Sequence, residues 1–239
     1  ATMALRYLVG GSTGAVGRAV VQVAVRDPRV TAVTALSRRD ISSADVGTAF
    51  GLQPEDDRSK IRVVRVAFGD LASSAEEIGP HDVCISCLGV YTADVKDLAD
   101  FMAKEHTPNM ELAQLCKTSL GVRAYSFLSG NGAKVTEEKG FFQAMFSFVK
   151  GRVEADLGAL FPGKFTSARP AFIAGRGGDR LGDKLANVVE NTPIGIHCND
   201  IAKAMVHSTM AGAGGAEQPP VLENGELKKV AAEYNARKQ

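Results

Sequence analysis

Three glycines near the start of the chain constrain its fold more than any other feature. Gly11, Gly14 and Gly17 have the spacing GxxGxxG and lie between the apolar run Leu5–Val9 and the alanine- and valine-rich segment Ala15–Arg26. The first segment predicts a strand and the second a helix that ends before an Asp-Pro pair. In such a turn the first glycine permits the tight bend, the second lets backbone approach a pyrophosphate, and the third allows close helix–strand packing.

This context predicts a dinucleotide site, because the helix N-terminus brings unpaired N–H groups and a partial positive charge to the turn. A glycine cluster that merely makes a tight turn is the simpler alternative. The residues expected to contact the cofactor here are Gly11, Ser12, Thr13, Gly14, Ala15, Val16 and Gly17.

Strand-like and helix-like segments alternate through the first two thirds of the chain. Further strands are expected at residues 30–36, 61–68, 82–88, 125–128 and 165–168. Helices are expected at residues 15–26, 44–50, 95–102, 107–117 (with Thr107 as N-cap) and 141–160. Strands that alternate with helices form a parallel sheet covered on both faces. The predicted fold class is therefore α/β, a doubly wound parallel sheet of the Rossmann type.

The pattern loosens after Arg169-Pro170, where glycine-rich loops and one or two helices replace the regular alternation. We expect residues 1–170 to form the dinucleotide-binding domain. Residues 171–239 are expected to form a small C-terminal lobe on the substrate side, packed on the same domain as one globular unit.

Composition excludes several classes of protein. The 28 Lys and Arg residues face 27 Asp and Glu residues, a net charge of +1, so no nucleic-acid partner is expected. Apolar runs of about eight residues fall short of the roughly 18 needed to cross a bilayer, so no membrane span is expected. Four scattered cysteines indicate reduced thiols rather than a disulfide scaffold. No secretory signal is visible, so a cytoplasmic protein is expected.

The end of the second predicted strand bears on the choice of cofactor. About twenty residues past the third glycine, where NAD enzymes place an acid for the ribose diol, the chain has Ser37-Arg38-Arg39. Two guanidinium groups would favour a 2′-phosphate through bidentate, charge-assisted hydrogen bonds. Arg38 and Arg39 therefore predict NADP(H), although they could also be solvated arginines on a loop.

Over most of its length the chain resembles the short-chain dehydrogenase/reductase superfamily, and more closely its atypical Tat-interacting-protein branch. The segments that carry the resemblance are 11–17, 37–39, 69–71, 81–89, 129–130, 149–154, 169–170 and 222–224. The resemblance implies that Asp70 and Leu71 contact adenine. It also implies that Cys87, Leu88 and Gly89 line the ribose and nicotinamide side, and that Pro170 covers the nicotinamide.

The reaction implied by the resemblance is hydride transfer to or from a carbonyl carbon. In the superfamily a serine positions the carbonyl, a tyrosine donates the proton, and a lysine four residues later binds ribose hydroxyls and lowers the tyrosine pKa. Ser129 fits the serine and Lys150 the lysine, but position 146 is Phe146, which has no proton to give. General acid–base catalysis is worth about 10²- to 10⁴-fold in rate, so the missing hydroxyl matters.

Three explanations for Phe146 stay open. Another donor could act, namely Tyr91, Ser147 or an ordered water. The acceptor could instead be quinone- or flavin-like, so that solvent supplies the proton. Alternatively, the protein binds NADP(H) without catalysis. The first expected function is an NADP(H)-dependent oxidoreductase on a small carbonyl or quinone-type acceptor, and the alternative is a non-catalytic, cofactor-gated regulatory protein with a protein partner.

The remaining candidates are assigned structural roles. Cys84 and Cys87, three apart in a strand, should point to opposite faces as buried thiols, and no metal site is expected. The four histidines lack ligand spacing, and of these His197 could reach the substrate cleft. The aromatic residues between 141 and 148 predict core or a subunit contact, so monomer and homodimer both stay open. Residues 227–239 predict a charged surface helix.

Overall fold

The fold is built on a seven-stranded sheet whose strand order is β3-β2-β1-β4-β5-β6-β9, with every pairing parallel. This computed structural model describes residues 4–136, 142–178 and 181–237. The strands are β1 (Leu5–Gly10), β2 (Val30–Ser37), β3 (Ile61–Arg65), β4 (Val83–Ser86), β5 (Ala124–Leu128), β6 (Phe165–Arg169) and β9 (Val221–Glu223). The predicted doubly wound α/β fold is confirmed. Strands β3 and β4 are shorter than expected at their carboxyl ends.

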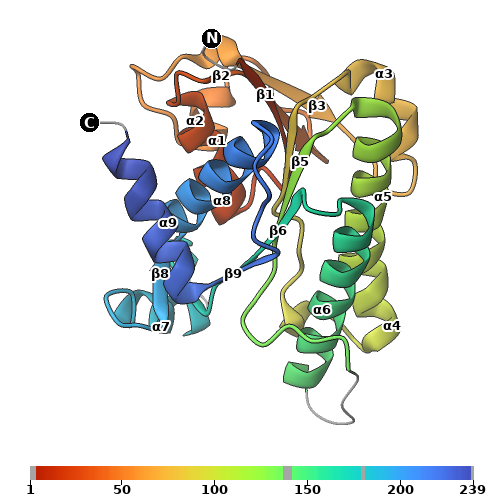
Figure 1. Ribbon diagram of the computed structural model, residues 1–239, viewed down its shortest axis with the longest axis vertical. Helices are drawn as coiled ribbons and strands as arrows, with labels where there is room; N and C mark the ends of the chain where they lie inside the picture. The colour runs from red at the N-terminus through yellow and green to blue at the C-terminus, as the bar shows by residue number, and fades with distance from the viewer. Residues whose placement is uncertain (1–3, 137–141, 179–180, 238–239) are drawn as a thin grey trace.

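Helices cover both faces of the sheet, as Figure 1 shows. One layer contains α1 (Ala15–Val25), α8 (Cys198–Ala213) and α9 (Asn224–Ala236), and the other contains α3 (Ala75–Ile78), α5 (Thr107–Leu115) and α6 (Phe142–Leu160). The short α2 (Val46–Phe50) follows β2. Phe141, the expected first residue of α6, lies outside the described residues, as do Lys238 and Gln239.

Alternation along the strands produces two cores. Tyr7 and Val9 of β1 pack with residues of α1 and α8, whereas Leu8 between them packs with residues of α5 and α6. In β4 and its extension, Cys84 belongs to the α5–α6 side and Cys87 to the other. Successive side chains of a strand point to opposite faces, so a strand buried on both sides reads as a continuous apolar run.

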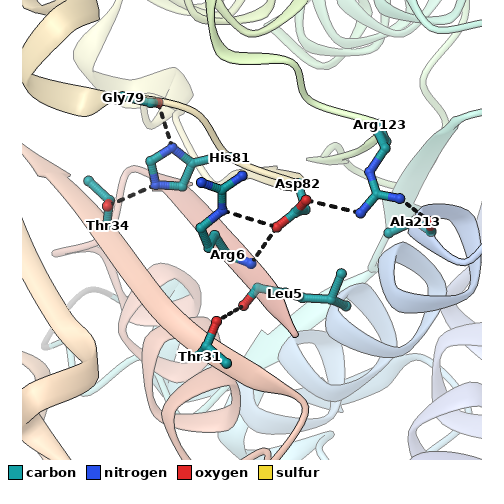
Figure 2. A network of polar contacts seen from close by, with 9 residues as sticks. All are labelled: Leu5, Arg6, Thr31, Thr34, Gly79, His81, Asp82, Arg123 and Ala213. Carbon is teal, nitrogen blue, oxygen red and sulfur yellow. Dashed lines mark hydrogen bonds and ion pairs between the residues drawn. The ribbon is translucent and has the colours of Figure 1, made fainter. Parts of the chain in front are cut away.

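A polar network ties together the amino ends of the central strands (Figure 2). Arg6 donates to one oxygen of Asp82 from its backbone N–H (2.8 Å) and its guanidinium (3.3 Å). Arg123 donates to the other oxygen (2.9 Å) and to the carbonyl of Ala213 (3.0 Å). Burial alone would raise the pKa of Asp82, but these hydrogen bonds from Arg6 and Arg123 outweigh it and lower the pKa.

His81 is buried in the same network. Its Nδ1 lies 2.9 Å from the carbonyl oxygen of Gly79, and its Nε2 lies 2.8 Å from the hydroxyl of Thr34 on β2 (Figure 2). Burial lowers the pKa of His81, because the imidazolium form would lose its hydration. His81 is therefore a neutral structural link between β2 and β4.

The expected helix break at Thr107 is wrong. The helix runs on from α4 (Leu98–Phe101) through a wider π turn at Met102–His106 into α5, and ends with a second π turn at Cys116–Leu120. Pro108 lacks an N–H, and its ring would crowd the carbonyl four residues earlier in a regular α-helix. The wider turn just before Pro108 lets the helix continue past it.

The last quarter of the chain divides between two places. Strands β7 (Phe172–Ala174) and β8 (Gly195–His197) form a separate parallel pair, which α7 (Leu181–Val188) accompanies. From residue 198 the chain returns to the main body, where α8 packs on α1 and β9 pairs with β6. The main sheet thus takes strands from both sides of residue 170, because β9 pairs with β6.

No helix in the described part of the chain is long and apolar enough to cross a membrane.

Candidate functional site

The glycine turn after β1 is shaped by two tight contacts and one open position. Gly11 has φ +68°, and a Cβ there would overlap the carbonyl group of Cys87. A Cβ on Gly17 would overlap the carbonyl group of Gly11. A Cβ on Gly14 would meet only the carbonyl oxygen of Gly11, at 3.4 Å, and Gly14 lines the groove described below. Only Gly14 thus leaves room for a ligand beside the backbone.

Helix α1 begins beside this open position without a side-chain cap. Its N-cap is Gly14, which has no side chain that could accept the N–H groups of the first turn. Ser12 is fully buried and donates to the carbonyl of Leu36 at 2.8 Å, so its side chain fixes the turn against β2. The N–H groups of the first turn therefore keep their capacity to bind an anion in the groove.

A groove crosses the carboxyl ends of the strands at the point where the strand order reverses. It consists of two adjoining cavities of about 1130 and 760 Å³. They share Gly14 and the loop Cys87–Val90, and the turn after β1 and the loop after β4 form their common wall. In doubly wound sheets this switch point is where ligands bind.

The larger cavity lies over the ends of β2 and β3 and is lined by two guanidinium groups. Arg38 and Arg65 are among the described residues that line this cavity, and Arg39 is not. The hydroxyl of Ser37 donates to the carbonyl of Arg39 (2.8 Å) and accepts from its N–H (3.1 Å), which shapes the turn. Arg65 is exposed and lies 3.2 Å from Asp40.

The sequence alone does not single out Arg65. The signal available was the alternation of apolar and basic residues in β3, which ends on this arginine. Only the parallel register, which pairs Ser37 of β2 with Arg65 of β3, shows that the residue reaches the same edge as Arg38.

Asp70 and Leu71 lie away from the lining of both cavities. Leu71 is buried and Asp70 is exposed. The carboxylate of Glu111 accepts the N–H groups of Gly69 (2.7 Å) and Leu71 (2.5 Å) and so holds this turn on α5. Because β3 ends early, the preceding residues line the larger cavity instead, namely Val66, Ala67 and Phe68.

The smaller cavity brings together the residues expected to act in catalysis. Its lining includes Ser129, Lys150, Tyr91, Phe146, Ser147 and Pro170. Ser129 follows β5, and its buried hydroxyl has no hydrogen-bond partner among the described residues. A buried hydroxyl without a partner costs free energy, so Ser129 is the kind of group expected at a ligand site.

Glycines let the loop after β5 lie directly on α6. The ring of Phe146 packs against Gly130, so closely that a Cβ on Gly130 would overlap it. A Cβ on Gly151 would overlap the backbone of Lys134, whose N–H donates to the carbonyl of Ser147 at 2.9 Å. The ring of Phe146 thus occupies the space next to Gly130 and lines the same cavity as Ser129, at the sequence position where the resemblance expects a tyrosine.

Lys150 forms a buried ion pair that was not predicted from the sequence. Its Nζ lies 2.5 Å from Oε1 of Glu105 and 3.0 Å from the carbonyl oxygen of Leu128. Glu105 is fully buried, and the Lys150 side chain is 7% exposed. The ammonium also lies over the ring of Phe127, 4.7 Å from its centroid. Glu105 belongs to the π turn before α5, and its carboxylate neutralises the lysine charge at this end of the groove.

Tyr91 stands at the rim of the smaller cavity, where its side chain is 42% exposed. The guanidinium of Arg176, which lines the same cavity, lies 5.4 Å from the centroid of the Tyr91 ring. The structure therefore brings Tyr91 to the same cavity as Ser129 and Lys150.

The wall of the smaller cavity that contains Pro170 is braced by contacts among three segments, 153–154, 169–170 and 222–224. Arg169 at the end of β6 donates to Glu154 of α6 and to Glu223 of β9, at 2.5 and 3.0 Å. Asn224 accepts the N–H of Ala171 (3.0 Å) and donates to the carbonyl of Pro193 (2.8 Å). These contacts fix the chain on both sides of Pro170, whereas Pro170 itself lines the smaller cavity.

The cysteines and histidines have structural surroundings. All four cysteines are free thiols, and burial raises the pKa of the Cys87 thiol to about 12. His197 accepts the N–H of Asn199 at 3.1 Å and so caps α8, and it packs against Gly175 instead of lining either cavity. Across the described residues, no group of three or more potential ligands could hold a metal ion.

The groove offers groups that suit an extended anionic ligand. Its two cavities meet beside an uncapped helix N-terminus and an open glycine, which suit a pyrophosphate. One end carries guanidinium groups, and the other carries a buried hydroxyl without a partner and a lysine. The donor set thus matches a ligand with phosphates in the middle and at one end.

No family model matches this chain. The protein fmp52, mitochondrial, of Emericella nidulans is 25% identical over 167 residues, which span 70% of this chain and 66% of that relative. The match therefore covers slightly less than two thirds of the length of the relative.

Solved structures with the same fold include several reductases. The PhqB reductase domain of Penicillium fellutanum is 18% identical with a TM-score of 0.65, and the match covers 87% of this chain and 65% of that domain. A short-chain dehydrogenase/reductase of Serratia marcescens is 14% identical with a TM-score of 0.64, covering 95% of this chain and 99% of that one. Yeast methylglyoxal/isovaleraldehyde reductase Gre2, solved with NADPH, is 14% identical with a TM-score of 0.63, covering 86% and 74%. At these identities the likeness establishes a shared Rossmann-like fold.

Proposed function

We propose that this protein binds NADP(H) and is an oxidoreductase acting on a small carbonyl or quinone-type acceptor. The observation that carries the proposal is the groove at the switch point, where the open Gly14 and the uncapped start of α1 adjoin both cavities. The resemblance to short-chain dehydrogenases and reductases supports it, and so does the fold shared with Gre2, which was solved with NADPH. Membership of the Tat-interacting-protein branch is part of the same proposal.

The preference for NADP(H) over NAD(H) rests on the larger cavity. Arg38 and Arg65 line it, and guanidinium groups bind a ribose 2′-phosphate through charge-assisted hydrogen bonds. Ser37 bonds only to the backbone of Arg39, which does not line this cavity, so the proposal rests on Arg38 and Arg65.

The chain's own residues would divide the work along the groove. The first turn of α1 would receive the pyrophosphate, and Lys150 would bind the ribose next to the nicotinamide. Ser129, whose hydroxyl has no partner among the described residues, would orient the carbonyl of the acceptor. The bound cofactor would supply or accept a hydride. A proton for the acceptor oxygen would come from Tyr91, Ser147 or solvent, because Phe146 has none to give.

A second function is favoured by one specific arrangement. Phe146 replaces the expected proton donor, and Glu105 already neutralises the Lys150 ammonium that would otherwise lower the pKa of a tyrosine. Both features suit a protein that binds NADP(H) without turnover and transmits its occupancy to a protein partner.

The cytoplasm is the proposed compartment in either case, and subcellular fractionation tests it.

Titration calorimetry with NADPH and NADH tests the proposed cofactor. We expect tighter binding of NADPH and a loss of about tenfold or more in NADPH affinity in Arg38→Ala. Arg58→Ala, a basic residue outside both cavities, is the control and should bind NADPH like the unsubstituted protein. A preference for NADH, or full affinity in Arg38→Ala, would refute the NADP(H) assignment.

Phe146→Tyr separates the two functions. With NADPH bound, turnover of a panel of small carbonyls and quinones is measured in both proteins. Substantial turnover by the unsubstituted protein supports the oxidoreductase and refutes the non-catalytic alternative. Turnover that appears only in Phe146→Tyr supports the non-catalytic protein.

A further inference from the structure

One helix holds the loop that both cavities share. Asn109 accepts a hydrogen bond from the hydroxyl of Ser86 at 2.6 Å, and Glu105 accepts one from the backbone N–H of Val90 at 2.9 Å. These two acceptors lie four residues apart, one turn of the helix, and so point the same way. The side chains of this helix therefore fix both ends of the loop between β4 and Tyr91.

Glu105 makes its second contact with the opposite wall. While Oε2 accepts from Val90, Oε1 accepts from the Lys150 ammonium of α6 at 2.5 Å. Both charged groups are buried, and Lys150 also donates to the carbonyl of Leu128. Burying a charged group is costly unless it is paired, and Glu105 is the partner that Lys150 has here.

The ion pair lies directly beneath the floor of the groove. A Cβ on Gly89 would lie 3.4 and 3.5 Å from the two Glu105 oxygens and 3.7 Å from the Lys150 Nζ. Gly89 lines both cavities, and Lys150 lines only the smaller one. Any side chain at position 89 would separate the pair from a ligand or displace it, so the pair and the bare glycine form one surface.

We propose that Glu105 is a positioning residue for the nicotinamide half of the cofactor. With one oxygen it holds the Val90 backbone and with the other the Lys150 ammonium, and so it sets both the floor and the charge of the smaller cavity. The adenine half would be held by Arg38 and Arg65, which line the larger cavity at the ends of β2 and β3. This inference rests on the proposed binding of NADP(H).

Two ligands distinguish positioning from a purely structural role. NADPH spans both cavities, whereas 2′,5′-ADP carries only the adenosine half with its 2′-phosphate. Glu105→Gln keeps the shape of the side chain and removes the charge that Lys150 needs. We expect it to lower NADPH affinity about tenfold or more while 2′,5′-ADP affinity stays within about twofold, because a truncated buried charge pair acts locally. Titration calorimetry measures both affinities, and thermal unfolding reports stability.

A double variant removes the stability effect. Glu105→Leu combined with Lys150→Met replaces the buried pair by apolar side chains of similar size, which proteins often tolerate without loss of stability. We expect it to unfold near the temperature of the unsubstituted protein but to bind NADPH more weakly than that protein does. Should Glu105→Gln fail to fold, this variant still tests the pair as a unit, because NADPH affinity at the unsubstituted level would exclude the pair from cofactor binding.

Glu111→Gln is the matched control, because Glu111 is a carboxylate on the same helix that holds the backbone turn 69–71. It should change the affinities for both ligands by the same factor, to within about twofold.

Three outcomes would overturn the inference. NADPH affinity at the unsubstituted level in the double variant would make the pair a structural brace only. Equal losses of NADPH and 2′,5′-ADP in Glu105→Gln would show a global effect. Equal affinity of the unsubstituted protein for both ligands would show that the nicotinamide half is not held, while leaving the proposed function intact.

Failure to bind either ligand would refute the proposed function itself. If NADH binds instead, NADH and ADP give the same comparison for Glu105.

Discussion

The amino edge and the carboxyl edge of the central sheet, by which we mean the two ends of its strands, differ in whether their polar groups have hydrogen-bond partners. At the amino ends, both oxygens of Asp82 accept from arginines, and both ring nitrogens of His81 have partners. At the carboxyl ends, the buried hydroxyl of Ser129 has no partner in the described chain, and α1 starts without a side-chain cap. Most buried polar groups have partners, so unsatisfied groups that line a groove indicate a place where a ligand or water can bind. Stability and ligand binding should therefore respond to substitutions at different edges.

Gly17→Ala is expected to have the largest effect, and it tests whether close packing at the carboxyl edge also serves stability. Its Cβ would overlap the carbonyl of Gly11 and lie 2.9 Å from Cα of Ser12. We expect the free energy of unfolding in urea to fall by about 2–3 kcal/mol, the usual cost of overpacking. Gly14→Ala is the matched control.

Gly14→Ala should change the free energy of unfolding by less than about 1 kcal/mol, because its Cβ meets one atom at 3.4 Å. It should nevertheless weaken NADPH binding, since the methyl group enters the groove. Equal destabilisation by the two substitutions would contradict the distinction between packed and open glycines.

Asp82→Asn tests the amino edge. The side chain loses its charge and one acceptor, and its arginine partners are about half exposed, so we expect a loss of about 1–2 kcal/mol with unchanged NADPH affinity. The pKa of Asp82 is lowered in the folded protein, so its contribution is present above the ordinary pKa of about 4 and is lost as pH falls further.

Urea unfolding of Asp82→Asn and the unsubstituted protein between pH 7 and pH 3 measures this dependence. The difference in unfolding free energy should shrink toward low pH. A constant difference, or a change in NADPH affinity, would show that the amino edge does not act as we describe.

His81→Gln should have a smaller effect, visible mainly as a change in pH dependence. Burial lowers the pKa of His81, so its neutral form stabilises the fold above the ordinary pKa of about 6.5, and this contribution is lost as pH falls through the lowered value. Between pH 7 and pH 5 the unsubstituted protein should lose up to about 1 kcal/mol more than His81→Gln. Parallel pH profiles in urea unfolding would refute a buried neutral imidazole.

Ser129→Ala should change stability least, by no more than about 0.5 kcal/mol, because its hydroxyl has no hydrogen bond to lose within the described chain. Ser126→Ala, on the strand β5 that Ser129 follows, is the control. It removes a buried hydroxyl that donates to the carbonyl of Thr166 at 3.1 Å, and it should cost about 1 kcal/mol. If Ser129→Ala were the more damaging of the two, the hydroxyl would have a structural partner after all.

The sequence predicted the architecture well, since strands and helices of ordinary length carry their own periodicity. Strand β9 escaped because it has three residues, follows two prolines and is recognised only by its pairing with β6. The break expected at Thr107 followed from Pro108, and sequence cannot show that a wider turn absorbs a proline.

The site was predicted less completely, for a related reason. The glycine turn and the arginine pair are local signals, so Gly14 and Arg38 could be placed in advance. Glu105 and Lys150 are 45 residues apart, and Glu105 alone resembles any surface glutamate. Contacts of this kind follow from tertiary packing, which local patterns do not encode.

Contacts between the amino-terminal and carboxyl-terminal parts of the chain also affect the order in which the protein folds. Tyr234 of α9 donates to Asp27 at 2.9 Å, across 207 residues, and the hydroxyl of Tyr7 on β1 lies 3.2 Å from the carbonyl of Val206 on α8. Contacts so distant in sequence form late, because long loops must close before they are made. During synthesis the part of α1 that packs on α8 therefore stays uncovered until α8 has left the ribosome. Transiently exposed apolar surface of this kind favours aggregation during folding.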